Sequence, residues 1–260
     1  MTNETPVVLY AIDGGIATLT LNRPEKRNAL NDAIIEQLKS LLLKANDDSS
    51  IRAIIIMGAG KDFCSGADLS ALQKIAEGSV AANAEDAQSL SELFTLIRSV
   101  TVPVIAAVRG RALAGGCGLA SACDLVLASA DARFGYPEVK IGFVPAMVTA
   151  ILRRNVSEKR AFELLTRGSE IDAATAQQFG FVNQVFADEK FDVEVKAYAG
   201  QFEKLSRSAV GLTKTLLYNI DGLSFPGALA AGADTNVIAR LTDDCRKGID
   251  RFLSKKTDPS

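Results

Sequence analysis

The spacing of apolar and polar residues divides the first part of the chain into short elements. Apolar stretches over residues 7–12 and 16–21 flank an Asp-Gly-Gly sequence at 13–15, which is typical of a β-hairpin. A polar segment with a proline follows, and apolar residues at helical spacing then predict a helix over 31–45. Residues 53–57 are continuously apolar, as in a strand that is buried on both faces. The chain therefore opens with two antiparallel strands, a loop, a helix and a buried strand.

The pattern then repeats with variation. The next predicted elements are a Gly-containing loop over 58–68, a helix that ends near Arg98, and buried strands over 104–108 and 124–128. Beyond Pro145 the pattern is mostly helical as far as Phe252, with one short strand over 181–186. We therefore predict an α/β fold with a strand-rich core over residues 1–195 and a helical C-terminal region over residues 196–260.

Composition and charge narrow the classes of function. The chain has 260 residues, and its 29 Lys and Arg nearly balance 31 Asp and Glu. No global basic field is available to attract nucleic acid or an anionic membrane, so any anionic ligand must be held locally. The sequence shows neither a leader pattern nor an apolar run long enough for a membrane span. We expect a cytoplasmic protein without nucleic-acid or membrane partners.

Cysteine and histidine usage argues against two common kinds of site. Cys64, Cys117, Cys123 and Cys245 form no C-x-x-C pair and lie in apolar or small-residue contexts, so we expect reduced thiols. The chain has no histidine, which removes the usual base of Ser and Cys nucleophile systems and the commonest transition-metal ligand. We therefore expect neither a catalytic triad nor a metal site.

One carboxylate lies alone in a long apolar stretch. Glu138 is the only acidic residue between Asp131 and Glu158, and it follows Pro137 directly. The neighbouring apolar residues are Phe134, Val139, Ile141, Phe143 and Val144. If they surround the carboxylate, they raise its pKa toward the range that is useful for proton transfer. The alternative is a solvated glutamate on a loop after proline.

Two glycine-containing loops have the composition that brings backbone N–H groups to a ligand. They are FCSGADL at 63–69 and the segment RALAGGCGL at 111–119, and each follows a buried strand and leads into a helix. Unpaired amides at helix starts favour negative charge, so two converging loops would form an oxyanion hole. For each loop alone, a tight turn chosen for packing is the better explanation.

The sequence matches two nucleotide-binding motifs only in part. Gly116 and Gly118, with Glu138 further along, resemble a dinucleotide fingerprint, but Ser121 stands where the third glycine belongs. The sequence GAGK at 58–61 resembles part of a phosphate-binding loop, but Asp62 follows in place of Ser or Thr. Neither motif is complete.

Four ordered segments resemble the enoyl-CoA hydratase/isomerase, or crotonase, superfamily. They are NRP through NAL at 22–30, FCSGADL at 63–69, GRALAGGCGLASACD at 110–124 and FGYPEVKIGFVP at 134–145. The resemblance covers essentially the whole chain. It implies a spiral of ββα units with a helical C-terminal trimerisation region, and a homotrimer or dimer of trimers.

The resemblance also implies the site residues. The backbone N–H groups of Ala67 and Gly115 match the oxyanion hole, and Glu138 matches the acid/base. Coenzyme A is expected as part of the thioester substrate, with no tightly bound cofactor. The residues implied for binding its adenine, pantetheine and phosphates are Lys26, Arg27, Cys64, Ser65, Gly66, Asp68 and Leu69, with Lys255 and Lys256 assisting from a neighbouring subunit.

The chain departs from the family pattern at one position. Family hydratases commonly carry a first glutamate where this chain has Gly118, so Glu138 alone remains. Moving a double bond needs one base, whereas adding water is simplest with two groups. The departure favours isomerase-type or single-glutamate hydratase-type chemistry. Thioester hydrolysis, dehalogenation and a non-catalytic acyl-CoA-binding protein are the alternatives.

Two points stay open at this level. Tyr136, Asp68 or another polar group is a candidate to replace the missing carboxylate. The shape of the acyl chain is expected to depend on residues 72–91 and 145–150.

Overall fold

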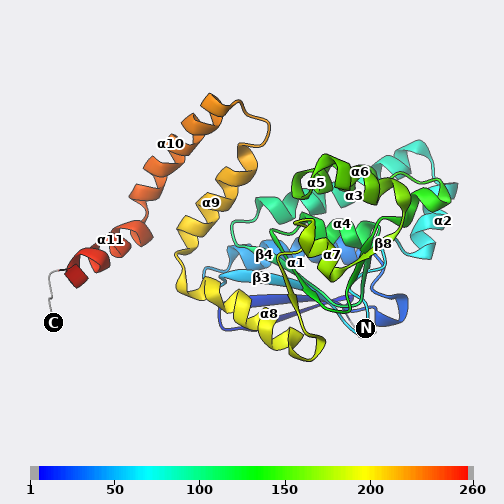
Figure 1. Ribbon diagram of the computed structural model, residues 1–260, viewed down its shortest axis with the longest axis horizontal. Coiled ribbons are helices and arrows are strands. Elements are labelled where there is room, and N and C mark those ends of the chain that lie inside the picture. The colour runs from blue at the N-terminus through cyan, green and yellow to red at the C-terminus, as the bar shows by residue number, and fades with distance from the viewer. Residues whose placement is uncertain (1–5, 257–260) are drawn as a thin grey trace, which may run out of the picture.

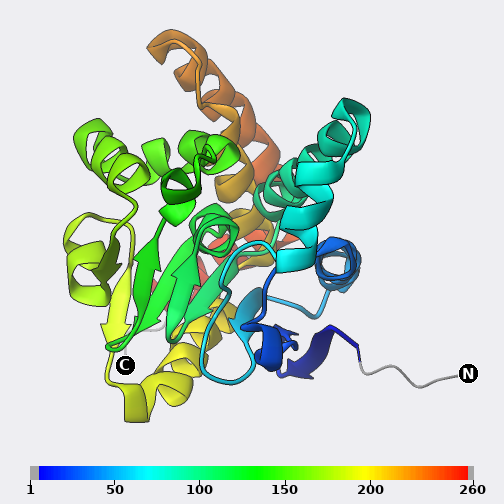
Figure 2. The same cartoon turned by 90° about the vertical axis from the view of Figure 1, so that its right-hand side faces the viewer.

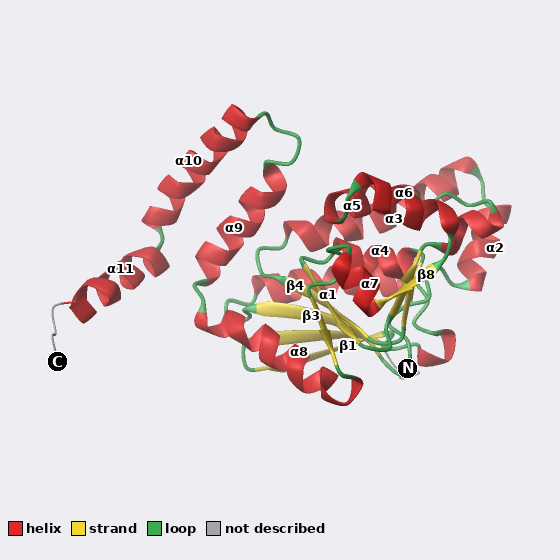
Figure 3. Cartoon of the chain, in the orientation of Figure 1, coloured by secondary structure: helices red, strands yellow, loops and turns green. Residues whose placement is uncertain are grey.

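Two β-sheets form the frame of the molecule (Figures 1 and 3). The computed structural model describes residues 6–256, without the side chains of Leu69, Leu72, Lys255 and Lys256. Within these residues a six-stranded sheet has the order β1-β2-β3-β4-β6-β9 and a three-stranded sheet has the order β5-β7-β8. The strands are β1 (Val8–Asp13), β2 (Ile16–Leu21), β3 (Ala53–Gly58), β4 (Val104–Val108), β5 (Arg111–Leu113), β6 (Leu125–Ser129), β7 (Arg133–Gly135), β8 (Glu170–Asp172) and β9 (Gln184–Phe186). The predicted α/β class is confirmed.

Helices surround the sheets and continue beyond them. The α-helices are α1 (Asp32–Asp47), α2 (Leu69–Glu77), α3 (Val80–Ser99), α4 (Gly115–Ala122), α5 (Ala146–Asn155), α6 (Glu158–Arg167), α7 (Ala173–Gln178), α8 (Phe191–Gly200), α9 (Arg207–Asn219), α10 (Phe225–Leu241) and α11 (Asp243–Lys256). Short 3-10 turns include η1 (Pro24–Lys26) and η2 (Pro137–Ile141). The boundary predicted at residue 195 falls inside α8.

The central strands of the larger sheet, β3, β4 and β6, are buried on both faces, as their continuously apolar sequences require. Alternate residues of each strand point to opposite faces, so Ile54 and Ile56 join the main core while Ala53 and Ile55 join a second cluster. Helix α8 covers that second face. Figure 2 shows α8, in yellow, below the strands, and α3, in teal, above them.

The chain passes from one sheet to the other through short turns between consecutive strands, and these turns produce its winding. Strand β4 of the larger sheet is followed after two residues by β5 of the smaller sheet, and α4 then begins at Gly115. Strands β6 and β7 repeat this change of sheet, and β4 pairs with β6 in parallel, as β5 does with β7. The chain therefore advances in ββα steps. The turn between β4 and β5 contains Gly110, whose φ is +59° and where a Cβ atom would lie 2.1 Å from the Lys61 carbonyl oxygen.

Two sequence-based expectations about elements were wrong. The single helix predicted to end near Arg98 is two helices, because Ser79 interrupts it and caps α3 by accepting from the Ala82 N–H at 3.2 Å. Of the strand predicted over 181–186, only residues 184–186 form a strand, β9. The N–H groups of Phe181 and Val182 donate to the Ala176 carbonyl and not to a neighbouring strand. Strands β5, β7 and β8 were not predicted, since three residues carry no readable alternation.

The C-terminal helices leave the core as an arm (Figure 1). A buried ion pair fastens its first helix: Lys214 of α9 lies 2.7 Å from the Asp124 carboxylate. The Lys214 ammonium also donates to the Ile97 and Val102 carbonyls at 2.9 and 3.0 Å. Asp124 accepts as well from Tyr218 Oη and from the Val104 N–H, each at 2.7 Å. The hydrogen-bonding groups of both side chains are matched, yet desolvation still lowers the pKa of Lys214 against the attraction of Asp124.

We expect Lys214→Met to lower the free energy of unfolding by about 3–5 kcal/mol, because it leaves the Asp124 charge buried without its cation. Chemical denaturation at fixed protein concentration measures this. Lys74→Met is the matched control, since its pair with Asp32 is exposed and such pairs contribute less than about 1 kcal/mol. Equal losses in the two variants would contradict the assignment.

Candidate active site

Backbone contacts join the two glycine-containing loops. The Cys64 N–H donates to the Arg111 carbonyl at 3.0 Å, and the Leu113 N–H donates to the Cys64 carbonyl at 2.9 Å. These bonds form a parallel bridge between Cys64 and Ala112. The first loop therefore lies directly beside β5 and the start of α4. The convergence that the sequence left open is present.

The approach is so close that only glycine fits at its centre. A Cβ atom on Gly66 would lie 2.7 Å from Ala114 Cβ and 3.5 Å from the Gly115 nitrogen, and Gly66 has a φ of +95°. Ala114 itself has a φ of +50°, a strained conformation for a residue with a side chain. Its N–H donates to the Gly135 carbonyl at 2.9 Å, which helps to hold it there. The site thus depends on backbone geometry.

Two N–H groups at this junction remain unpaired. The neighbouring N–H groups of Ser65 and Asp68 donate to the Arg27 and Leu30 carbonyls at 3.1 and 3.0 Å. Within the described part of the chain, no hydrogen bond from the N–H of Ala67 or Gly115 is found. Gly115 is the first residue of α4, where N–H groups lack an intrahelical acceptor and the helix dipole favours negative charge. The pair can therefore bind an anionic oxygen.

Glu138 is the second residue of η2, the turn that follows β7, and it is half-buried. Its Oε2 atom is buried and has no hydrogen-bond partner among the described residues. Desolvation by burial raises the pKa of its carboxyl above the usual value, opposed by a hydrogen bond from its own N–H. The raised pKa makes this carboxylate a stronger base than a solvated glutamate, as proton transfer requires.

The surroundings predicted for Glu138 were partly wrong. Phe134 is buried, but Ile141 and Val144 are 70% and 67% exposed, and Phe143 and Val139 are also exposed. The turn η2 ends at Gly142 with a left-handed φ of +75°, so the chain reverses there and these side chains point outward. Burial still raises the pKa of Glu138, and its carboxylate in turn helps to raise the pKa of Cys117 and of Tyr136.

Of the residues implied for binding coenzyme A, some have exposed side chains and others have side chains that are buried or already paired. Lys26 at the end of η1 and Arg27 directly after it are exposed, and the Arg27 carbonyl accepts from the Ser65 N–H, so this turn adjoins the first loop. Cys64 is buried, and burial raises the pKa of its thiol to about 12. Asp68 caps α2 through Ser70 and lies 2.7 Å from Arg23 Nη2. The side chains of Leu69, Lys255 and Lys256 lie outside the described residues.

Neither Tyr136 nor Asp68 is suited to replace the carboxylate that position 118 lacks. The Ser70 N–H and the Arg23 guanidinium hold the pKa of Asp68 at about 2, so it is a committed ion-pair partner. Tyr136 is only 1% exposed, and its hydroxyl points inward, 3.4 Å from Ser121 Oγ. Burial raises the pKa of Tyr136 well above its usual range. Position 118 is buried glycine.

Some residues that shape the site were missed in the sequence. Asn28 is buried with a φ of +54°, and its amide donates to the Ala59 and Asp62 carbonyls at 2.9 and 2.7 Å. Arg23 holds Asp68. The sequence offered one indication for Asn28, since Asn is one of the few residue types that tolerate a left-handed conformation.

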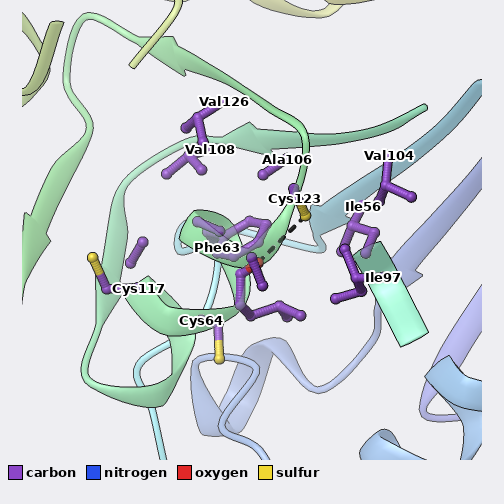
Figure 4. Close-up of a cluster of buried hydrophobic side chains, with 14 of the residues drawn as sticks. Ile56, Phe63, Cys64, Ile97, Val104, Ala106, Val108, Cys117, Cys123 and Val126 are labelled. Atoms are coloured by element: carbon purple, nitrogen blue, oxygen red, sulfur yellow. Dashed lines mark hydrogen bonds between the residues drawn. The ribbon is translucent and has the colours of Figure 1, made fainter. Parts of the chain in front are cut away.

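The cysteines pack as apolar residues. Figure 4 shows Cys64, Cys117 and Cys123 with Phe63 and side chains of β3, β4 and β6, and its dashed line marks the Cys123 thiol donating to the Leu119 carbonyl at 3.3 Å. All four cysteines are free. Among residues 6–256, no cluster of potential ligands that could hold a metal ion is found. In the same part of the chain no helix is long and apolar enough to cross a membrane.

Comparison with known proteins agrees with this geometry. The family model described as enoyl-CoA hydratase/isomerase matches residues 11–259. A putative enoyl-CoA hydratase of Thermus thermophilus is 39% identical over 243 residues, covering 94% of this chain and 96% of that protein. The 2,3-dehydroadipyl-CoA hydratase of Escherichia coli is 36% identical over 243 residues, covering 93% of each. The crystal structure of an enoyl-CoA hydratase from Mycobacterium smegmatis superposes with a TM-score of 0.91 at 33% identity, covering 96% of this chain and 97% of that one.

The chain therefore belongs to the enoyl-CoA hydratase/isomerase family. The crotonase-like fold that the sequence motifs implied is confirmed.

Glu138→Gln is expected to be at least as stable as the wild type at pH 8. Because the folded pKa of Glu138 is raised, its contribution to stability is complete below its unfolded pKa and is lost as pH rises through the folded value. The variant has no such loss, so its stability relative to wild type should increase from pH 4 to pH 8, measured by denaturant unfolding. Glu189→Gln, at an exposed carboxylate, is the control; a Glu138→Gln variant that loses stability at pH 8 would contradict the assignment.

Proposed function

We propose that this chain binds an acyl-CoA thioester and transfers protons on its acyl chain. The observation that carries the proposal is the pair of unpaired N–H groups, Ala67 and Gly115, on two loops pressed together at Gly66. In this proposal they bind the thioester carbonyl oxygen. Glu138, with its raised pKa, exchanges the proton at the adjacent carbon.

The chemistry follows from where charge develops. Removal of a proton from the α-carbon moves negative charge onto the thioester oxygen. Donors that already point at that oxygen stabilise the enolate, and loss of one such donor typically costs ~3 kcal/mol of barrier. An unpartnered carboxylate oxygen that is shielded from water is a stronger base than a solvated one.

The coenzyme A moiety is proposed to lie along the first loop. Lys26 and Arg27 are exposed cations beside Ser65 and can pair with its phosphates. Backbone groups of Cys64, Ser65, Gly66, Asp68 and Leu69 would line the adenine and pantetheine pocket, since the side chains of Cys64 and Asp68 are already engaged. Lys255 and Lys256 of a neighbouring subunit are proposed to assist. No tightly bound cofactor enters the proposal.

The reaction is hydration or double-bond isomerisation with Glu138 as the single carboxylate. The names of the relatives favour hydration, while Gly118 favours a one-base reaction. A non-catalytic acyl-CoA-binding protein is the alternative, because a site with one carboxylate can bind without turnover. Four free cysteines agree with the proposed cytoplasmic setting.

Incubation with crotonyl-CoA and 3-hexenoyl-CoA in deuterated water tests the catalytic role. We expect deuterium exchange or a changed double bond with the wild type, and a loss of about 10²-fold or more with Glu138→Gln, because the proton acceptor is gone. Mass spectrometry measures both. Binding of the thioester, measured by calorimetry, should persist in the variant. Normal activity in Glu138→Gln refutes the role, and binding without any exchange in the wild type favours the non-catalytic alternative.

A homotrimer, alone or paired, is also proposed. Along α10 the exposed residues Phe225, Leu229, Ala233, Val237 and Leu241 recur every four positions and form one apolar stripe. Such a stripe on an arm that extends from the core is typical of a surface that another subunit covers.

Val237→Glu is expected to shift the protein to lower mass in sedimentation experiments, because a charge would be buried in the subunit contact. Val193→Glu makes the same substitution at an exposed valine of α8, away from α10, and should leave the mass unchanged. If Val237→Glu sediments like the wild type, α10 does not form the contact.

A further inference from the structure

An ion pair joins the first glycine-containing loop to the polar turn that follows β2. The Nη2 atom of Arg23 lies 2.7 Å from the Asp68 carboxylate, and the two side chains are only 16% and 9% exposed. The Nη1 atom of Arg23 donates to the Ala29 carbonyl at 3.0 Å. One guanidinium thus connects residues that are 45 positions apart and also holds the backbone of its own turn.

Backbone hydrogen bonds between the same two segments set the direction of one N–H group. The Leu30 N–H donates to the Gly66 carbonyl at 2.7 Å, and the Asp68 N–H donates to the Leu30 carbonyl at 3.0 Å. These bonds form a parallel bridge between Leu30 and Ala67. Neighbouring N–H groups along a paired segment point to opposite sides, so the Ala67 N–H points away from Leu30. The bridge therefore orients the donor that is proposed to bind the thioester oxygen.

The ion pair spans this bridge from one segment to the other. The bridge is isolated and lies outside the strands of both sheets, so it depends on side chains for support. Arg23 contacts Ala29 on one segment and Asp68 on the other, directly beside the bridged residues. The second oxygen of Asp68 accepts from the Ser70 N–H and hydroxyl at 3.0 and 2.9 Å, which fixes the direction of the carboxylate. The pair therefore holds the two segments in register.

The turn that carries Arg23 also carries Lys26 and Arg27, the cations proposed for the phosphates of coenzyme A. This turn is closed on Arg23 itself, because the Arg23 N–H donates to Asn28 Oδ1 and the Asn28 N–H donates to the Arg23 carbonyl, each at 2.9 Å. The side chain of Arg23 differs from its exposed neighbours, since each of its Nη atoms already has a protein acceptor. Arg23 is thus placed to orient the loop and not to bind phosphate.

We infer that Arg23, paired with Asp68, is a positioning residue that keeps the Ala67 N–H directed at the thioester oxygen. The inference rests on the proposed function and deepens it. Arg23 acts through the bridge and does not touch the substrate. Its loss leaves the N–H group in the chain but releases its position, and a displacement of ~1 Å from the reacting atoms can cost about 10²-fold in rate.

Two thioesters separate positioning from phosphate binding. 3-Hexenoyl-CoA carries the phosphates, whereas the 3-hexenoyl thioester of pantetheine has the same acyl group without them. Mass spectrometry follows deuterium exchange at the α-carbon in deuterated water. We expect Arg23→Met to lower kcat for 3-hexenoyl-CoA at least ~10-fold with less than a ~3-fold change in KM, because an interaction made in the transition state is lost. The value of kcat/KM should fall by the same factor with the pantetheine thioester.

A bound thioester that does not turn over reports the hydrogen bonds directly. Butyryl-CoA labelled with ¹³C at its thioester carbonyl has a saturated chain, so it is neither hydrated nor isomerised. Hydrogen bonds to a carbonyl oxygen weaken the C=O bond and lower its stretching frequency. In isotope-edited infrared spectra we expect binding to the wild type to lower this frequency, and binding to Arg23→Met to lower it less.

Three further variants control for folding and for charge. Asp68→Asn keeps an oxygen that is able to cap α2 but removes the ion pair. Combining it with Arg23→Met leaves no unpaired charge, so the double variant serves if a single variant fails to fold. Because the pair acts as a unit, the double variant should lose about as much activity as each single variant. Arg160→Met breaks an exposed pair with Glu163 on α6 and should change neither readout. Thermal unfolding confirms that each variant is folded.

Three results would overturn the inference. A loss of activity confined to 3-hexenoyl-CoA makes Arg23 a phosphate ligand. An unchanged carbonyl frequency in folded Arg23→Met shows that the donor has not moved. Losses that add up in the double variant show that Arg23 and Asp68 act separately. Failure of the proposed function is recognised in the wild type alone, by the absence of both α-proton exchange and a lowered carbonyl frequency, and it removes the inference as well.

Discussion

The close approach of other elements to the backbone of α4 is the constraint on which the site depends. Side chains are missing where contact is tightest: a Cβ atom on Gly116 would lie 2.3 Å from the Cys64 carbonyl oxygen, and one on Gly66 would lie 2.7 Å from Ala114 Cβ. These contacts bring two backbone segments together with N–H groups left over, because neighbouring amides are consumed by the bridges between the loops. The packing of the chain thus leaves two N–H groups that are able to donate to an oxyanion.

Buried polar groups in this molecule fall into two physical classes. Lys214, Asp124, Arg23 and Asp68 are matched by partners, and their role is to connect elements that are far apart in sequence. Glu138 differs because one of its oxygens is buried and unmatched, so the protein favours its neutral form more than water does. A buried carboxylate in this molecule is thus paired where donors surround it, whereas Glu138 keeps an unpaired oxygen because no donor among the described residues lies beside it.

Much of the fold could be predicted from the sequence, because long regular elements show a clear periodicity of apolar residues. The buried strands β3 and β4, the hairpin and α1 were predicted within two residues of their bounds. The three-residue strands of the second sheet were not, since their pairing depends on partners distant in the chain. The C-terminal arm was predicted as helical, but the sequence did not reveal that Lys214 and Tyr218 fasten it to the end of α4.

The sequence by itself determined which residues are available to the candidate site: a single carboxylate in an apolar segment, two glycine-containing loops and a glycine at 118. Only the tertiary structure decided where their side chains lie and what they contact. It turned Ile141 and Val144 to the surface, engaged Asp68 with Arg23, pointed Tyr136 inward and set Val148 against Gly118. The reason is that residue identity and spacing specify local conformation, whereas a pKa, an unpaired N–H group or a filled volume depends on atoms that the fold brings from elsewhere in the chain.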